Sequence, residues 1–215
     1  MATDSKSSIY LAKTDPPVVI KVFPPASPPT FLISLSHPKI VHLLKHGFFE
    51  NGCAYWVMSY FAGVPLYQKV PKDAGLTFSQ AWPLFDSLLD VISFLHENGI
   101  LHLDLKPSNI LVGQKDTIQI IDFDHAEYAS TAAPRSRGTP GYVAPECIVG
   151  ESPPTAASDI YSLGTILAFL LTGKHDATAT DAPSQMQNII SKAMSLRPQN
   201  RFSSVSELRT CLANG

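Results

Sequence analysis

The spacing of hydrophobic residues predicts that the first 61 residues are rich in strands. Apolar runs at 9–12 and 18–23 are short, and the second is rich in valine and isoleucine, which favour β-strands. A proline-containing turn sequence separates these runs, so we expect a β-hairpin. A second hairpin is predicted where apolar runs at 48–50 and 54–61 flank Asn51-Gly52, a dipeptide typical of tight turns.

The later part of the chain has the periodicity of helices. Thr77 and Gln80 have the spacing of a capping box, and apolar residues then recur every three or four positions until Gly99, which predicts a long helix. Apolar residues cover most of a second helix, 160–171, which ends at Gly173 and is therefore expected to be buried. Further elements are expected as a short helix that begins at Ser27 and Pro28 and runs through Phe31, Leu32 and Leu35, strands at 110–112 and 118–121, a helix at 186–194, and a last helix capped by Ser204 and Glu207.

The composition narrows the classes of function. The chain has 16 Lys and Arg against 18 Asp and Glu, a net charge of −2, and this balance gives no basic surface for nucleic acid or an anionic membrane. No apolar stretch reaches the length of a membrane-spanning helix, and the first residues lack the parts of a secretory signal. Three cysteines cannot all form disulfides with one another. We therefore expect a cytoplasmic protein with no nucleic-acid or membrane partner.

Residues suited to phosphoryl transfer gather in one predicted loop. The segment 102–109 contains Asp104, Lys106 and Asn109, and Asp122 directly follows a predicted strand. A carboxylate can accept a hydroxyl proton, an ammonium can neutralise a phosphate, and Asn and Asp oxygens can bind magnesium. Each residue alone has an ordinary role, because a single Asp in a loop usually forms a turn or a cap. The combination indicates magnesium-assisted phosphoryl transfer.

These residues belong to a series of motifs that resembles the eukaryotic-type (Hanks-type) Ser/Thr protein kinases, including their bacterial members, over most of the chain. Lys106 and the segment 138–142 resemble the Ser/Thr branch more than the Tyr branch. The motifs occur in the order of the family: Val18-Val19-Ile20-Lys21 of the third strand, 55–63 of the fifth strand and hinge, 102–111 of the catalytic loop, Asp122-Phe123-Asp124 in place of Asp-Phe-Gly, 138–146 at the end of the activation segment, 158–164 at the start of helix F, and Arg201, which would pair with Glu146.

The resemblance implies an α+β, bilobal protein-kinase-like fold. It implies a reduced strand-rich N-lobe over 1–61 and a helical C-lobe over 62–215, in which little chain is left for helix G after Gly173. It also implies ATP and magnesium as cofactors and a protein as substrate. The implied roles are catalysis by Asp104 and Lys106, nucleotide binding by Lys21, Met58, Phe61 and Leu111, magnesium binding by Asn109 and Asp122, and structural support by Asp159, Glu146 and Arg201.

The first lobe departs from the family pattern. No glycine precedes Gly47, so we expect the glycine-rich loop that covers the phosphates to be missing together with the first strand. No acidic residue lies between Lys21 and Glu50, so helix C cannot supply the usual partner of the lysine. We expect Lys21 to pair with Asp122 instead. Asp124 takes the place of a glycine in the family motif and adds a carboxylate beside Asp122.

A further departure concerns regulation. Leu103 stands where the family has the arginine that binds a phosphorylated activation loop. We therefore expect activity that does not depend on phosphorylation of four hydroxyl residues, Ser130, Thr131, Ser136 and Thr139. Two interpretations stay open: a minimal protein Ser/Thr kinase, and a pseudokinase that serves as a binding or scaffold module. Either is compatible with a protein partner that covers the reduced N-lobe.

Overall fold

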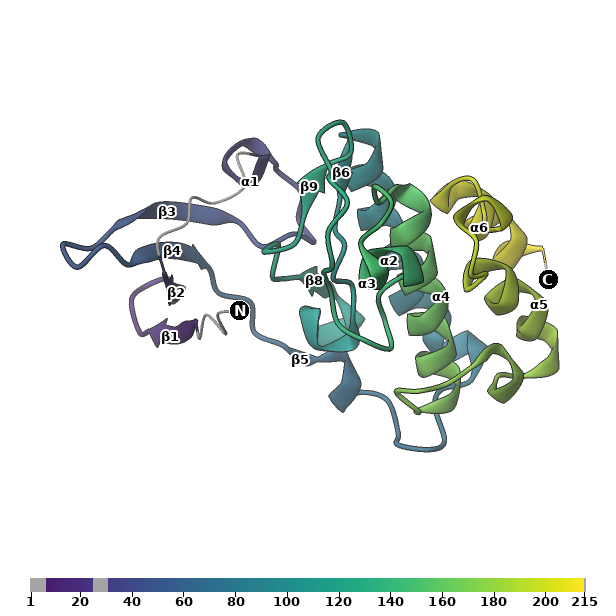
Figure 1. The fold of residues 1–215 in the computed structure, drawn as a ribbon. Helices are drawn as coiled ribbons and strands as arrows, with labels where there is room; N and C mark the ends of the chain where they lie inside the picture. The colour runs from purple at the N-terminus through teal and green to yellow at the C-terminus, as the bar shows by residue number, and fades with distance from the viewer. Residues whose placement is uncertain (1–6, 25–30, 215) are drawn as a thin grey trace.

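A sheet of strands and a group of helices form two lobes (Figure 1). The computed structural model describes residues 7–24 and 31–214. The α+β architecture expected from the sequence is confirmed, because a strand-rich N-lobe precedes a helical C-lobe. One hydrophobic core includes residues of both lobes, from Phe31 to Leu212. The two lobes therefore share buried surface where they meet.

The N-lobe is built on a four-stranded antiparallel sheet in the order β1-β2-β4-β3. Strand β1 (Ser8–Ala12) pairs with β2 (Val18–Phe23), which confirms the first predicted hairpin. Strand β4 (Ala54–Ser59) lies between β2 and β3 (Leu43–Phe48). Because side chains alternate across a strand, Lys21 shares one face of β2 with Val19, and both line the cavity below the sheet.

The second hairpin forms, but its first strand lies earlier than expected. The prediction of a strand at 48–50 is wrong, because β3 ends at Phe48 and Glu50 lies in the turn. The sequence pattern did not indicate β3, because the strand contains polar residues and a β-bulge between Leu43 and Lys45 interrupts the alternation of its side chains between the two faces of the sheet. Gly52 lies in the turn with φ of 82°, a conformation that favours glycine.

The segment that corresponds to helix C is one short helix, α1 (Phe31–Ser34). Its predicted start at Ser27 lies outside the described residues. Phe31 and Leu32 are buried, and the Phe31 ring contacts Phe123 edge to face with a centroid separation of 6.2 Å. The first turn of α1 contains no acidic residue, and its buried residues contact the C-lobe through apolar side chains.

Two long helices form the centre of the C-lobe. Helix α2 (Phe78–Glu97) begins with the predicted capping box, in which the Thr77 hydroxyl and the Gln80 side chain each accept a bond from the other residue's backbone. Helix α4 (Ala156–Thr172) is buried along most of its length, as its apolar sequence predicted. Gly164 of α4 allows α5 to approach closely, because a Cβ there would lie 2.8 Å from the Cβ of Ala193.

The other elements complete the C-lobe around these two helices. Between Gly173 and α5 the chain forms only one short 3-10 turn, so the region where the family places helix G is reduced as expected. Within the described ranges, no helix is long and apolar enough to cross a membrane. The elements not yet given are α3 (Pro145–Val149), α5 (Ser184–Ala193), α6 (Val205–Ala213), β5 (Val64–Pro65), β6 (Ile100–Leu101), β7 (Ile110–Val112), β8 (Ile118–Ile120), β9 (Glu127–Tyr128), and 3-10 turns at Leu66–Gln68, Pro107–Asn109, Gln114–Asp116, Ala179–Asp181 and Pro198–Asn200.

Candidate active site

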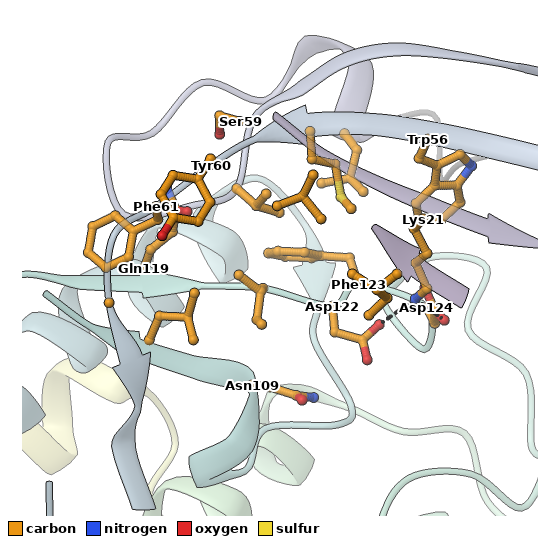
Figure 2. Close-up of a pocket in the computed structure, with 18 of the residues that line it drawn as sticks. Lys21, Trp56, Ser59, Tyr60, Phe61, Asn109, Gln119, Asp122, Phe123 and Asp124 are labelled. Atoms are coloured by element: carbon orange, nitrogen blue, oxygen red, sulfur yellow. Dashed lines mark hydrogen bonds and ion pairs between the residues drawn. The ribbon is translucent and has the colours of Figure 1, made fainter. Parts of the chain in front are cut away.

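A cavity of about 460 Å³ lies between the sheet of the N-lobe and the strands β7 and β8 (Figure 2). Its volume is in the range of small-molecule binding sites. The four residues predicted to bind nucleotide and the two predicted to bind magnesium all line it: Lys21, Met58, Phe61, Leu111, Asn109 and Asp122. The fold therefore brings six residues from distant parts of the sequence to one cavity.

Two carboxylates hold Lys21 at one end of this cavity. Its Nζ lies 3.1 Å from Oδ1 of Asp122 and 2.5 Å from Oδ2 of Asp124 (Figure 2). The predicted pairing of Lys21 with Asp122 is confirmed, and Asp124 adds a second partner that the sequence did not indicate. The ring of Trp56 lies 5.7 Å from Nζ, within the range of a cation–π contact. Lys21 is thus fixed in the cavity without a helix C glutamate.

The three charges shift one another's pKa values. Burial opposes the charge of Lys21, but the attraction of Asp122 and Asp124 outweighs it and raises the pKa of the ammonium. Burial also opposes the charge of Asp122, and Lys21 outweighs this effect, so the pKa of Asp122 is lowered. For Asp124, burial and the neighbouring charge of Asp122 raise the pKa. Lys21 is therefore protonated and Asp122 ionised at neutral pH, the states that phosphate and metal binding require.

Asp104, Lys106 and Thr139 form a closed ring of hydrogen bonds. Lys106 Nζ donates to Asp104 Oδ2 at 2.7 Å and to Thr139 Oγ1 at 2.6 Å, and the Thr139 hydroxyl donates to Asp104 Oδ1 at 2.8 Å. The ring joins the catalytic loop to the activation segment, which we define as residues 122–146. Sequence analysis missed this position of Thr139, although the motif Gly-Thr-Pro-Gly-Tyr that contains it was the available signal.

Asn109 and Asp122 offer oxygen atoms that fit magnesium. The Asn109 amide nitrogen donates to the Asp104 backbone carbonyl at 2.9 Å, which fixes the amide and leaves its oxygen with only a 3.4 Å contact from the Ser108 hydroxyl. Among the described residues, no group of three or more His, Cys, Asp or Glu side chains could enclose a metal ion. Magnesium usually binds one or two protein ligands together with phosphate and water oxygens. The pair therefore fits a magnesium ion that binds together with a nucleotide.

The buried carboxylate of Asp159, in α4, holds the backbone of the catalytic loop. It accepts hydrogen bonds from the N–H of His102 at 2.9 Å and of Leu103 at 2.8 Å, and it pairs with the His96 ring at 2.9 Å. Leu103 has φ of 63°, which is unfavourable for a residue other than glycine, so the loop needs such support. Burial opposes the charge of Asp159, but the hydrogen bond from His96 outweighs it and lowers the pKa. These contacts support the structural role predicted for Asp159.

A second buried ion pair fastens the end of the activation segment to the last part of the chain. Arg201 donates to both carboxylate oxygens of Glu146, each at 2.8 Å, and Ser158 Oγ donates to Glu146 at 2.8 Å. The predicted pairing of Glu146 with Arg201 is therefore confirmed. Burial opposes the charge of Glu146, and the bonds from Arg201 outweigh it, so the pKa of Glu146 is lowered.

Gln119 is a residue of the cavity that sequence analysis did not find. It lies opposite Leu111 across β7 and β8, so both side chains line the cavity on the same face of this sheet. The Gln119 side chain is buried, and its Oε1 has no hydrogen-bond partner in the part of the chain that the structure describes. In the sequence it is one polar residue within a short strand, and nothing there distinguishes it from a solvent-exposed position.

Comparison with known proteins agrees with this geometry. Residues 30–211 match the protein kinase domain. The chain is 32% identical over 208 residues to a probable serine/threonine-protein kinase PknB of Lactococcus lactis. This alignment covers 85% of the present chain and 33% of the relative. It is 30% identical over 211 residues to serine/threonine-protein kinase PknB of Mycobacterium leprae, in an alignment that covers 83% of this chain and 33% of that relative. It is also 34% identical over 149 residues to CBL-interacting protein kinase 21 of Oryza sativa, in an alignment that covers 65% of this chain and 27% of that relative.

The match extends over most of the described residues, but the chain spans only about a third of the length of these curated relatives. It includes the catalytic loop, the activation segment and the helices around them. The chain belongs to the protein kinase family, in its Ser/Thr branch.

Proposed function

We propose that this chain is the catalytic domain of a protein Ser/Thr kinase, which transfers the γ-phosphoryl group of ATP to a protein hydroxyl with the help of magnesium. The observation that carries the proposal is the ring of Asp104, Lys106 and Thr139. Asn109 links this ring to the cavity in which Asp122 pairs with Lys21. This arrangement provides a base, phosphate-binding cations and metal-binding oxygens within one site.

Each of these residues has a task in the proposed reaction. Asp104 orients the substrate hydroxyl and takes its proton as the oxygen attacks the γ-phosphorus. Lys106 neutralises charge on the transferred phosphoryl group, and Lys21 binds the α- and β-phosphates. Magnesium, when bound by Asn109 and Asp122, would stabilise the charge that develops as the bond between the γ-phosphorus and the leaving oxygen breaks.

The apolar part of the cavity is suited to the adenine ring. Met58 and Leu111 line it from β4 and β7. Phe61 lines it where the chain passes from one lobe to the other (Figure 2). We propose that the Phe61 backbone contacts the adenine edge, that Met58 lies at the back of the adenine pocket, and that Leu111 lies beneath the ring.

We also propose that the activity does not require phosphorylation of the activation segment. Leu103 is buried and packs with Val143, Ala144 and Cys147 where the family has a phosphate-binding arginine. Alanine at Ser130, Thr131 and Ser136 should therefore leave the turnover number unchanged. Thr139 must be removed from the set named in the sequence analysis, because its hydroxyl bonds Asp104 and its loss should reduce turnover for a structural reason.

Asp104→Asn tests the enzyme directly, because it keeps the size of the side chain and removes the base. Magnesium-dependent stabilisation by ATP, measured as a thermal shift, should be the same for the wild type and the variant. Transfer of labelled phosphate to the chain itself and to casein should fall at least a hundredfold in the variant, since a general base contributes about 10²–10⁴ to the rate. Transfer that survives in Asp104→Asn would contradict the assigned base.

The pseudokinase interpretation is the second candidate, and it is favoured by how few residues cover the cavity on the N-lobe side. Of the described residues before β2, only Ser7 and Ile9 line the cavity, and no glycine precedes Gly47 to let a backbone loop approach the phosphates. A wild-type chain without a thermal shift at millimolar ATP would support this interpretation. A shift that requires magnesium, together with phosphate transfer, would support the enzyme.

A protein partner on the N-lobe is proposed on the basis of strand β1. It is an edge strand, and Ile9, Tyr10 and Leu11 are exposed on it, which is a surface that another chain can cover. The cytoplasmic location stays a prediction, supported by the three cysteines Cys53, Cys147 and Cys211, which are free.

A further inference from the structure

An acidic residue of β9 pairs with two arginines of the activation segment. Glu127 Oε2 lies 2.8 Å from Nη1 of Arg137, and Glu127 Oε1 forms an ion pair with Arg135. The Arg137 side chain is 1% exposed, and its guanidinium also donates to the backbone carbonyls of Ala133 and Arg135. We call Glu127, Arg135 and Arg137 the charge clamp. The proposed reaction assigns no task to these three residues.

The charge clamp lies beside the start of the catalytic loop and beside the residues that lead to Thr139. Glu127 is paired in register with Leu101, and the catalytic loop begins at the next residue, His102. On the other side, the backbone N–H of Arg137 donates to the carbonyl of Cys147 at 2.9 Å, and Thr139 follows two residues later. An opening of the clamp would therefore free the part of the activation segment that positions Thr139 against Asp104.

A second observation shows what replaces the missing arginine of the catalytic loop. Leu103 belongs to a buried apolar cluster with Leu101, Val143, Ala144 and Cys147, so this position holds the segment through packing rather than through charge. The segment then has its cations elsewhere, at Arg135 and Arg137, and Glu127 already forms ion pairs with both. A phosphate on this segment would have to displace Glu127 to reach these arginines.

We propose that Glu127 supplies permanently the negative charge that a phosphorylated residue would add, and that the charge clamp keeps the activation segment in position for phosphoryl transfer. Glu127 is in this sense a positioning residue. The inference rests on the proposed function and names the regulation of the same site: the activation segment is ordered by folding alone, without a modification step.

Glu127→Gln tests the clamp, because it keeps the shape of the side chain and both arginines but removes the charge. Trypsin should cleave the native variant after Arg135 or Arg137 roughly ten times faster than the wild type, since cleavage follows the population of the opened segment. The kcat of phosphoryl transfer should fall by about tenfold, while the KM for ATP should stay within twofold. A merely structural loss would not separate kcat from KM in this way.

Three variants complete the experiment. Asp86→Asn is the matched control, because it frees Arg209 from an ion pair of 2.7 Å at the surface and should change neither measurement by more than twofold. Glu127→Asp keeps the charge and should restore most of the protection and of kcat. Arg135→Gln removes only the exposed half of the clamp, so it should fold even if Glu127→Gln does not. Because it also removes one trypsin site, its effect is read from kcat and from cleavage after Arg137, and should be in the same direction but smaller.

The inference is overturned if Glu127→Gln matches the wild type in trypsin protection and kcat, or if Glu127→Asp fails as Glu127→Gln does. It is also overturned if phosphatase treatment of the wild type abolishes its activity. The absence of any phosphoryl transfer by the wild type would refute the proposed function instead. The trypsin measurement needs no catalysis, so it would still decide whether the clamp orders the segment.

Discussion

Glu146→Gln is expected to destabilise the chain strongly, although it replaces one oxygen atom by an amide nitrogen. Arg201, whose side chain is fully buried, donates to both oxygens of Glu146 at 2.8 Å. After the substitution, the guanidinium stays buried and keeps only neutral acceptors, among them the carbonyls of Ala157 and Ser195 at 2.8 Å. The cost is therefore that of a buried charge without its counter-charge.

The size of this effect follows from the burial of both partners. Removal of one member of a buried ion pair costs about 3–5 kcal/mol in the free energy of unfolding. Domains typically have about 5–15 kcal/mol in total, so the variant should lose a fifth or more of its stability. With an m-value of about 2 kcal/mol/M in urea, the unfolding midpoint should move down by about 1.5–2.5 M.

Urea unfolding followed by tryptophan fluorescence measures this shift, and Asp86→Asn is again the control. Asp86 and Arg209 are 2.7 Å apart, but their side chains are 38–39% exposed, so their pair should contribute only about 0–1 kcal/mol. Equal midpoints for Glu146→Gln and Asp86→Asn would refute the reasoning. The pKa of Glu146 is lowered by folding, so the stabilisation is present above its ordinary value near 4.5 and lost as the pH falls through the folded value. The difference between wild type and Glu146→Gln should therefore shrink in acid.

Three further predictions concern backbone and site. Gly173→Ala should reduce the stability of the chain more than Gly99→Ala. Both glycines have φ near +70°, but only at Gly173 would a Cβ lie 2.1 Å from the Pro71 carbonyl oxygen. Urea unfolding of both variants checks this, and equal losses of stability would contradict it. Asp124→Gly should weaken ATP binding by roughly fivefold, about 1 kcal/mol, because Lys21 keeps only one carboxylate partner. Titration calorimetry measures the affinity, and an unchanged value would show that Asp122 alone suffices to position Lys21. Thr139→Ala should lower kcat about tenfold with the KM for ATP unchanged, whereas Thr139→Ser, which keeps the hydroxyl, should retain most of the activity. Steady-state kinetics of both variants test this. An equal loss in the serine variant would rule out the missing hydroxyl as the cause.

The helices and the ion pairs of the site could be predicted because their signals are local or belong to ordered motifs. The capping pair at Thr77 and the apolar periodicity that follows it specify α2 without any tertiary information. Glu146 and Arg201 could be paired because both stand at recognisable motif positions. Such positions determine partners even when the residues are far apart in the chain.

The features that could not be predicted depend on tertiary packing. Strand β3 was misplaced because a bulge and two basic residues disrupt its alternation, and only its pairing with β4 reveals it. The hydrogen-bonded cap of the last helix also differs from its prediction: Ser204 accepts from the Glu207 N–H, but the Glu207 carboxylate bonds the Ser203 N–H rather than that of Ser204. Glu127 and Arg137 gave no signal, because nothing in a local pattern indicates that a charged residue will be buried against another.

The contacts at Asp124 and Glu127 suggest a common explanation for how so small an N-lobe is compatible with an ordered site. In the family pattern, one positioning charge comes from helix C and another from a phosphorylated residue, so both can be withdrawn by motion or by dephosphorylation. Here the charge that holds Lys21 and the charge that holds Arg137 both come from the activation segment, within four residues of one another. Both are in place once this segment has folded against the C-lobe. A chain arranged in this way needs no movable helix C to hold Lys21 in the cavity.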